Sequence, residues 1–95
     1  MSHYVVIVEI VVRAGAESEV ARLFSGPFMA AISAQDGFRS VQLLKPLDGL
    51  SHLLIISFAD QELQRKWVGT DLHTEVWSAM EAHFSTYSVR TFHTA

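Results

Sequence analysis

The sequence predicts an α+β fold in which helices cover one face of a four-stranded antiparallel sheet. Two observations predict it. Segments rich in β-branched and apolar residues alternate with segments of helical periodicity, in the order β-α-β-β-α-β. Two of the β segments are also apolar on both of their faces, which indicates strands that are covered on both sides.

The first β segment, residues 4–12, is dense in β-branched residues and ends at the turn-forming Arg13-Ala-Gly15. Because successive side chains of a strand point to opposite faces, the even-numbered and odd-numbered residues form two separate sets. Glu9 is the only charge in either set, and its burial would require either a partner charge or a raised pKa. If the last strand pairs with the first so that Glu9 faces Tyr87, then Arg90 lies near enough to supply that charge.

The middle of the chain predicts one helix followed by a hairpin. Apolar residues recur at helical spacing over residues 16–35, and Gly37 stands where a left-handed residue ends a helix. Gly26-Pro27 interrupts this stretch, yet the apolar phase continues across it, which favours a kink over two separate helices. Residues 38–45 and 52–59 then form two strands joined by a turn at residues 46–49.

The last third of the chain predicts two helices and a closing strand. Asp60 can cap a helix that Gly69 ends, and another helix runs from Thr70 or Asp71 to about residue 82. Residues 86–92 complete the sheet. The order of these elements is that of a ferredoxin-like fold, and the length predicts a single domain over residues 1–95.

The composition excludes several classes of function. The chain of 95 residues has a formal net charge of −3 and no cluster of Lys or Arg, which argues against a nucleic-acid partner. Its apolar stretches are too short to span a bilayer, and no secretory signal is recognisable. The absence of cysteine excludes disulfides and thiolate chemistry and fits a cytoplasmic location. Small molecules and protein surfaces remain as partners.

The predicted architecture leaves one face of the sheet without helices. Because the first and third strands are apolar on both faces, a monomer would expose an apolar patch on the order of several hundred Å² there. The same patch on a second copy is self-complementary. We therefore expect a homodimer that pairs sheet against sheet.

The histidines and tryptophans are the candidate functional residues. No two of the five histidines stand four residues apart and no HExxH motif occurs, so we expect no metal site. His73 precedes Trp77 by one helical turn, where an imidazole could act as a base near neutral pH or, alternatively, bond the backbone as a structural residue. His52 begins a strand and could be solvated or face the mouth of a pocket. Trp67 and Trp77 can form the walls of a pocket for a planar ligand or, with Phe28 and Met80, fill the core.

Four motifs resemble a known family: the apolar first strand that ends in Arg13-Ala-Gly15, Asp36-Gly-Phe38, Ser57-Phe-Ala-Asp60 and Trp67-Val-Gly-Thr-Asp71. Together they resemble the antibiotic biosynthesis monooxygenase family of dimeric α+β barrels, over essentially the full chain. The resemblance implies a pocket between sheet and helices that is often used without metal or flavin, so no cofactor is expected.

The same resemblance assigns roles to individual positions. Trp67 matches a tryptophan used in several branches, and His73 falls near a position where others carry a histidine or an aromatic residue. The haem-degrading branch has a histidine and an asparagine where Trp77 and Val8 stand here, which argues against haem degradation. With Val8 at the pocket, the residues expected at the dimer interface are Val5, Ile7, Glu9 and Val11.

These observations lead us to expect a cofactor-independent monooxygenase that acts on a small aromatic phenol or quinol. His73 is the expected catalytic residue, and the expected substrate-binding residues are Trp67, Trp77, His52, Val8, Phe28 and Met80. Two alternatives stay open. One is a non-catalytic domain that binds a small ligand or a partner on the same dimeric scaffold. The other is an isomerase or lyase of a small oxygenated metabolite, whose polar groups would have to come from His52, His73 and Arg39.

Overall fold

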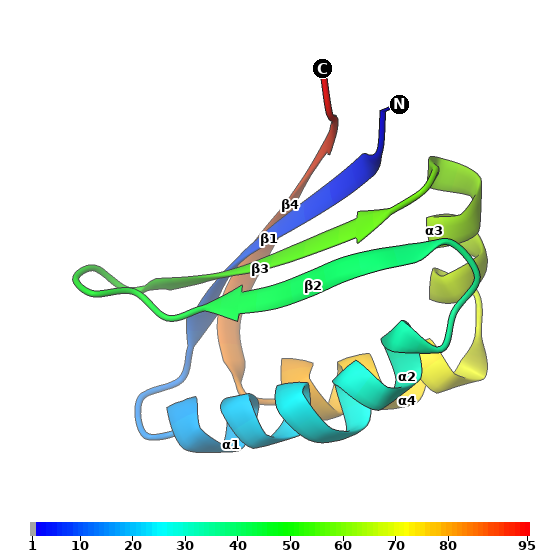
Figure 1. The fold of residues 1–95 in the computed structure, drawn as a ribbon. Coiled ribbons are helices and arrows are strands. Elements are labelled where there is room, and N and C mark those ends of the chain that lie inside the picture. The colour runs from blue at the N-terminus through cyan, green and yellow to red at the C-terminus, as the bar shows by residue number, and fades with distance from the viewer. Residues whose placement is uncertain (1) are drawn as a thin grey trace.

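The computed structural model describes residues 2–95 and confirms the predicted α+β fold (Figure 1). The elements follow one another in the order strand, helix, strand, strand, helix, strand, with each helical region divided into shorter segments. Their bounds are β1 Tyr4–Val12, α1 Glu17–Leu23, η1 Phe24–Phe28, α2 Met29–Ser33, β2 Phe38–Leu44, β3 Ser51–Phe58, α3 Gln61–Val68, α4 Asp71–Glu81 and β4 Phe84–His93.

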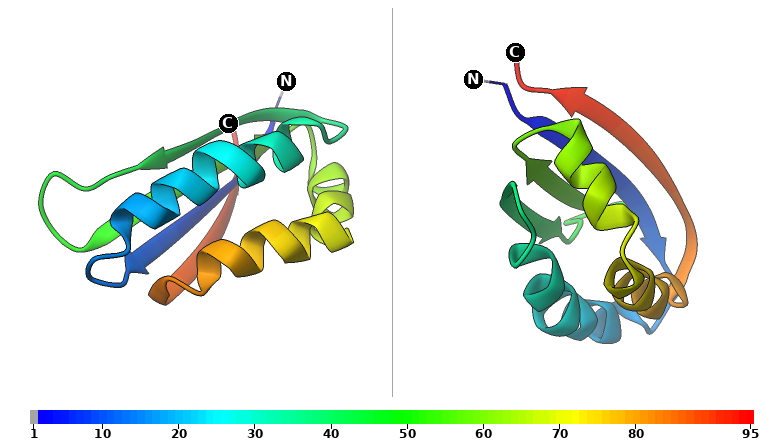
Figure 2. Two further views of the ribbon diagram at one scale, coloured as in Figure 1. Left: turned by 90° about the horizontal axis from the view of Figure 1, so that it is seen from below. Right: turned by 90° about the vertical axis from the view of Figure 1, so that its right-hand side faces the viewer.

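The four strands form one antiparallel sheet in the order β2-β3-β1-β4. All of the helices lie on the same side of this sheet, as the two turned views in Figure 2 show. The central strands β1 and β3 are those whose sequences are apolar on both faces, in agreement with the prediction. None of the helices among residues 2–95 is long and apolar enough to cross a membrane.

The hydrophobic core lies between the helices and one face of the sheet. On β1 the even-numbered residues from Tyr4 to Ile10 are at most 7% exposed, whereas the odd-numbered residues are partly or fully exposed. On β3 the residues with even numbers are again the buried ones. The two-fold periodicity of each strand therefore separates a core face from a face that no helix covers.

The interruption at Gly26-Pro27 is a π-helical turn, η1, which lies between α1 and α2. A proline lacks the N–H that an α-helical hydrogen bond requires. The wider π turn accommodates the missing hydrogen bond, and the backbone stays helical on both sides. The apolar face is thereby kept in phase, so that Val20, Phe28 and Ile32 are all buried. The helix ends earlier than predicted, at Ser33 with Ala34 as its C-cap, so the positive φ of 79° at Gly37 belongs to the turn that leads into β2 and not to the helix end.

The pairing of β4 with β1 differs from the expected one by a single residue. Glu9 was expected to face Tyr87, but Glu9 pairs with Ser88, and Tyr87 pairs with Ile10. A one-residue shift moves every side chain of a strand to the other face of the sheet. Tyr87 consequently lies on the helix-covered face. Arg90 lies on the opposite face, and no ion pair joins it to Glu9 among residues 2–95.

The cause of this shift lies at the start of β4, which begins at Phe84 rather than Thr86. Phe84 is 4% exposed and pairs with Val12, and an irregularity in the pairing falls between Val11 and Val12. Ser85 is the extra residue between the pairs Val12–Phe84 and Val11–Thr86, and this bulge sets the register of the rest of the strand.

Candidate functional site

A cavity of about 250 Å³ lies between the helix-covered face of the sheet and the helices α3 and α4. Its floor consists of aliphatic side chains from β1, β3 and β4, and its walls are mainly aromatic. The residues that line it are Val6, Val8, Phe28, Ile56, Gln64, Trp67, Val68, His73, Trp77, Tyr87 and Val89.

The corner between α3 and α4 positions the two central residues of this cavity. The Asp60 carboxylate accepts a hydrogen bond of 2.9 Å from the Leu63 amide and so begins α3. At the other end, the Thr70 hydroxyl donates to the Trp67 carbonyl at 2.7 Å. The same hydroxyl accepts from the His73 amide at 3.0 Å and caps α4. One side chain thus links the end of the helix that carries Trp67 to the start of the helix that carries His73.

The imidazole of His73 lies between two indoles. It meets the Trp67 ring edge to face, with a centroid distance of 5.0 Å and an interplanar angle of 87°. It is nearly parallel to the Trp77 ring, at 9° and 6.3 Å. Burial among these rings lowers the pKa of His73, because the charged form loses hydration. The ring is therefore neutral at neutral pH, and one of its nitrogens can accept a proton.

Tyr87 lines the cavity from β4 and is 39% exposed, so the cavity is open to solvent on this side. Its ring packs edge to face against Trp77 at 5.5 Å and against Phe84 at 6.1 Å. Hydrogen bonding to the carboxylate of Glu81 raises the pKa of the Tyr87 phenol. Tyr87 consequently stays protonated at neutral pH and acts as a neutral wall of the cavity.

Few polar groups converge on this cavity. The amide of Gln64 and the imidazole of His73 are the ones that lie within the lining, beside the indole N–H groups and the Tyr87 hydroxyl. No group of three His, Asp or Glu residues among residues 2–95 lies close enough together to hold a metal ion. The lining is therefore predominantly apolar and aromatic, with few polar groups that could orient a ligand.

The structure brings together five of the seven residues that the sequence singled out for the pocket. His73, Trp67, Trp77, Val8 and Phe28 all line the cavity. Met80 does not, because it points into the core and is 2% exposed. His52 lines a separate cavity, and Arg39 is exposed on β2. His52, His73 and Arg39 therefore do not converge. The three polar side chains that an isomerase or lyase would need do not share one site.

Three lining residues with functional potential were not anticipated, namely Gln64, Tyr87 and Val89. Gln64 precedes Trp67 by one helical turn, so the helical spacing could have indicated it. Tyr87 and Val89 were assigned to no site because the expected register placed Tyr87 on the other face of the sheet. Only the pairing of β4 with β1 could have located them.

Comparison with known proteins gives a family match and many matches of fold. The model of the antibiotic biosynthesis monooxygenase family matches residues 3–77. No match was found among proteins of curated function. Solved structures that share the fold include SnoaB, a cofactor-independent oxygenase from Streptomyces nogalater, with 24% identity and a TM-score of 0.85 over 100% of this chain and 94% of that one.

Two further structures show how widely the fold is shared. A conserved protein from Methanosarcina mazei is 11% identical, with a TM-score of 0.85 over 97% of this chain and 92% of that one. The haem-degrading protein Rv3592 from Mycobacterium tuberculosis is 22% identical, with a TM-score of 0.77 over 99% and 92%. At these identities the likeness establishes the fold alone, which is that of the dimeric α+β barrel proteins.

Proposed function

Since the chain belongs to the antibiotic biosynthesis monooxygenase family, we propose that it is a monooxygenase that oxidises a small aromatic phenol or quinol without a cofactor. The observation that carries this proposal is the position of His73. A neutral, half-buried imidazole lies between two indoles and faces a largely apolar cavity of about 250 Å³.

The chemistry that this arrangement supports begins with a proton transfer. His73 accepts the hydroxyl proton of the substrate, and the resulting phenolate is electron-rich enough to reduce dioxygen directly. In the overall reaction a phenol and O2 give a quinone and water. One oxygen atom enters the ring, the other leaves as water, and the substrate supplies all the electrons. No external reductant is consumed.

The other lining residues orient the substrate and shield one side of it from water. Trp67 is 1% exposed and closes the inner end of the cavity, while Trp77 and Tyr87 form an aromatic wall against which a planar ring can stack. The Gln64 amide can donate a hydrogen bond to a substrate oxygen. Because the floor is aliphatic, a phenolate formed here is poorly hydrated, which strengthens its interactions with the nearby donors.

The lack of a cofactor in the proposed mechanism has support from one relative of the same fold. SnoaB is described as a cofactor-independent oxygenase. The polar groups of this lining are the His73 imidazole, the Gln64 amide, the two indole N–H groups and the Tyr87 hydroxyl. They fit a reaction in which the protein needs only to deprotonate and orient its substrate.

Oxygen uptake with a panel of quinols and naphthols tests the proposal. We expect substrate-dependent uptake that is lost in His73→Ala and kept in the matched control His83→Ala, whose side chain lies outside the cavity. No uptake above buffer with any substrate, or full activity in His73→Ala, would contradict the proposed role. Saturable quinol binding without oxygen uptake would instead support the alternative of a non-catalytic ligand-binding domain.

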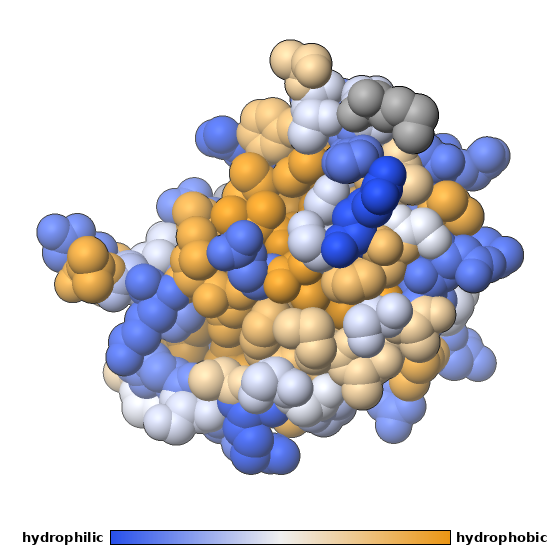
Figure 3. All heavy atoms as spheres, in the orientation of Figure 1, coloured by the Kyte–Doolittle hydropathy of each residue, from blue (hydrophilic) through white to orange (hydrophobic). Residues whose placement is uncertain are grey.

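We also propose that the protein acts as a homodimer that associates through the uncovered face of the sheet. Figure 3 shows hydrophobic residues gathered over the strands on this side of the molecule. In the register of the sheet, this face carries Val5, Ile7, Glu9 and Val11 of β1, Leu53 and Ile55 of β3, Leu44 of β2, and Arg90 and Phe92 of β4.

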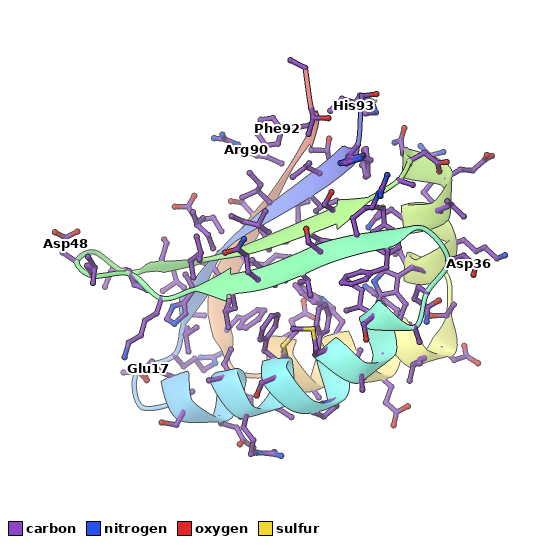
Figure 4. All side chains as sticks on the ribbon, viewed as in Figure 1. Glu17, Asp36, Asp48, Arg90, Phe92 and His93 are labelled. Carbon is purple, nitrogen blue, oxygen red and sulfur yellow. The ribbon has the colours of Figure 1, made fainter. Side chains whose placement is uncertain are left out.

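The two charges on this face favour a symmetric pairing. Glu9 and Arg90 have no ionic partner among residues 2–95, and Figure 4 shows Arg90 and Phe92 pointing from β4 away from the helices. In a two-fold dimer, Arg90 of each copy would lie near Glu9 of the other copy. Such pairing would satisfy both charges when the apolar face is buried.

A further inference from the structure

His52 is the only polar side chain among residues 2–95 that is buried, and it takes no part in the His73 cavity. It is 7% exposed and lies on the helix-covered side of β3, opposite Ile10 of β1. Its Nδ1 atom is shielded from solvent and has no hydrogen-bond partner. Leu54, the next residue on the same face, shows that an aliphatic side chain can be buried there without this penalty.

A second cavity, of about 220 Å³, lies beside this imidazole. It is formed by the start of α1, the end of β2 and the start of β3, and no residue lines both cavities. Figure 4 labels Glu17 at the start of α1, at the opposite end of the molecule from α3. The residues that line this cavity are Glu17, Ser18, Ala21, Leu43, Lys45 and His52.

We assign the proton of His52 to Nε2, because an N–H group at the shielded Nδ1 atom would have no acceptor. No hydrogen bond from either ring nitrogen to the protein occurs among residues 2–95. The Nε2–H group is therefore free to donate to a molecule in the cavity.

The charged residues of this cavity are also without partners. The only ion pair among residues 2–95 joins Arg22 to Glu19, so Lys45 and Glu17 form no direct ion pair. Lys45, the Ser18 hydroxyl and the His52 ring together offer three kinds of hydrogen-bond donor. The aliphatic side chains of Ala21 and Leu43 complete the lining.

We propose that this cavity binds a small molecule that carries a single carboxylate and a short aliphatic chain. The carboxylate accepts hydrogen bonds from Lys45, Ser18 and Nε2–H of His52, and the chain lies against Ala21 and Leu43. Glu17 repels a second negative charge, so a monocarboxylate binds in preference to a dicarboxylate or to phosphate. The proposal concerns a site separate from the His73 cavity and is independent of the oxygenase reaction.

Titration of the full chain with sodium butyrate, followed by NMR at constant ionic strength, tests this site. We expect saturable shifts of the His52 ring and of the amides around Lys45, and weaker binding of succinate and phosphate. Lys45→Gln should weaken butyrate binding by about tenfold, as expected for the loss of one charge-assisted hydrogen bond. Lys66→Gln, a matched change on α3 outside this cavity, should leave it unaltered.

A second variant separates a ligand-binding role of His52 from a structural one. His52→Leu should abolish butyrate binding and leave the melting temperature unchanged or raised, because an unpartnered polar group is replaced by an apolar one of similar size. A lowered melting temperature would show that the ring is structural and overturn the proposal. Shifts that rise without saturation, phosphate binding as tight as butyrate, or an equal effect of Lys66→Gln would also overturn it.

Discussion

The two faces of the sheet are built from the same strands but differ in how deeply their side chains are buried. On the helix-covered face, Val8 and Leu54 are at most 3% exposed and contribute to the core or the His73 cavity. On the other face, their sequence neighbours Ile7 and Leu53 are comparably apolar but only partly buried. The difference arises because no helix lies on that side of the sheet.

This contrast separates two sources of stability. Residues of the covered face stabilise each folded chain by itself, so their effects should not depend on protein concentration. Residues of the uncovered face gain burial only when another surface covers them, so their effects should depend on concentration. Substitutions on the two faces can therefore test whether only the uncovered face contributes stability that depends on protein concentration.

The largest effect is expected from truncating the covered face. Leu54→Ala should lower the free energy of unfolding by about 2–5 kcal/mol at every protein concentration, because it leaves a cavity in the core. Leu53→Ala, its neighbour on the same strand, should cost clearly less in dilute protein. Urea denaturation at two concentrations measures both variants. Equal losses for the two variants in dilute protein would contradict the separation of the faces.

A charge on the uncovered face should have the next largest effect. Val11→Lys should raise the dissociation constant of the dimer by about tenfold or more, because an unpaired ammonium would be buried between the sheets. Sedimentation or light scattering measures the association. Leu72→Lys, a similar change at an exposed position of α4, serves as the control and should leave association unaltered. A dimer that survives Val11→Lys unchanged would show that a different surface associates.

On the covered face, removing the Thr70 hydroxyl that links α3 to α4 should have a smaller effect on stability. Thr70→Val should lower the free energy of unfolding by about 1 kcal/mol, because the cap of α4 and the bond to the Trp67 carbonyl are both lost. Thr70→Ser keeps the hydroxyl and should restore stability. If Thr70 also positions His73 for the proposed reaction, kcat should fall in the valine variant and recover in the serine variant. An unchanged kcat in Thr70→Val would limit its role to folding.

The smallest effect is expected from the titration of His73. Burial lowers the pKa of His73 in the folded chain, so the unfolded chain binds its proton more readily. The contribution of His73 to stability is therefore complete at neutral pH and decreases as the pH falls through its lowered pKa. His73→Phe should remove this component from the decline in unfolding free energy between about pH 7 and pH 5. An equal decline in the unfolding free energy of the unsubstituted protein and of His73→Phe would contradict a lowered pKa of His73.

Some parts of the candidate site could be predicted from local sequence. The spacing of Trp67, His73 and Trp77 on two successive helices was enough to place them together, because helical periodicity is a local property. Tyr87 could not be placed in this way. Its side depends on how β4 pairs with β1, and these strands are distant in the sequence. A one-residue difference in that pairing moved Tyr87 from the uncovered face into the wall of the cavity.

His52 and Met80 show a second limit of local sequence patterns. Both were expected at the same pocket as His73, since each lies on an element that faces the space between sheet and helices. The structure places Met80 in the core and His52 at the far end of that space, beside a separate cavity. An alternating or helical pattern indicates which face a residue occupies. It does not indicate where along the face a cavity remains open.

The sequence by itself determined the α+β fold, the family, the two apolar faces of β1 and β3, and the helical positions of Trp67, His73 and Trp77. These features follow from residue periodicity and from helix-capping residues, which act over a few positions of the chain. Only the tertiary structure decided the register of β4, and with it the roles of Tyr87 and Arg90. It also decided that His73 and His52 line separate cavities, because packing between distant segments determines which parts of a shared core are filled.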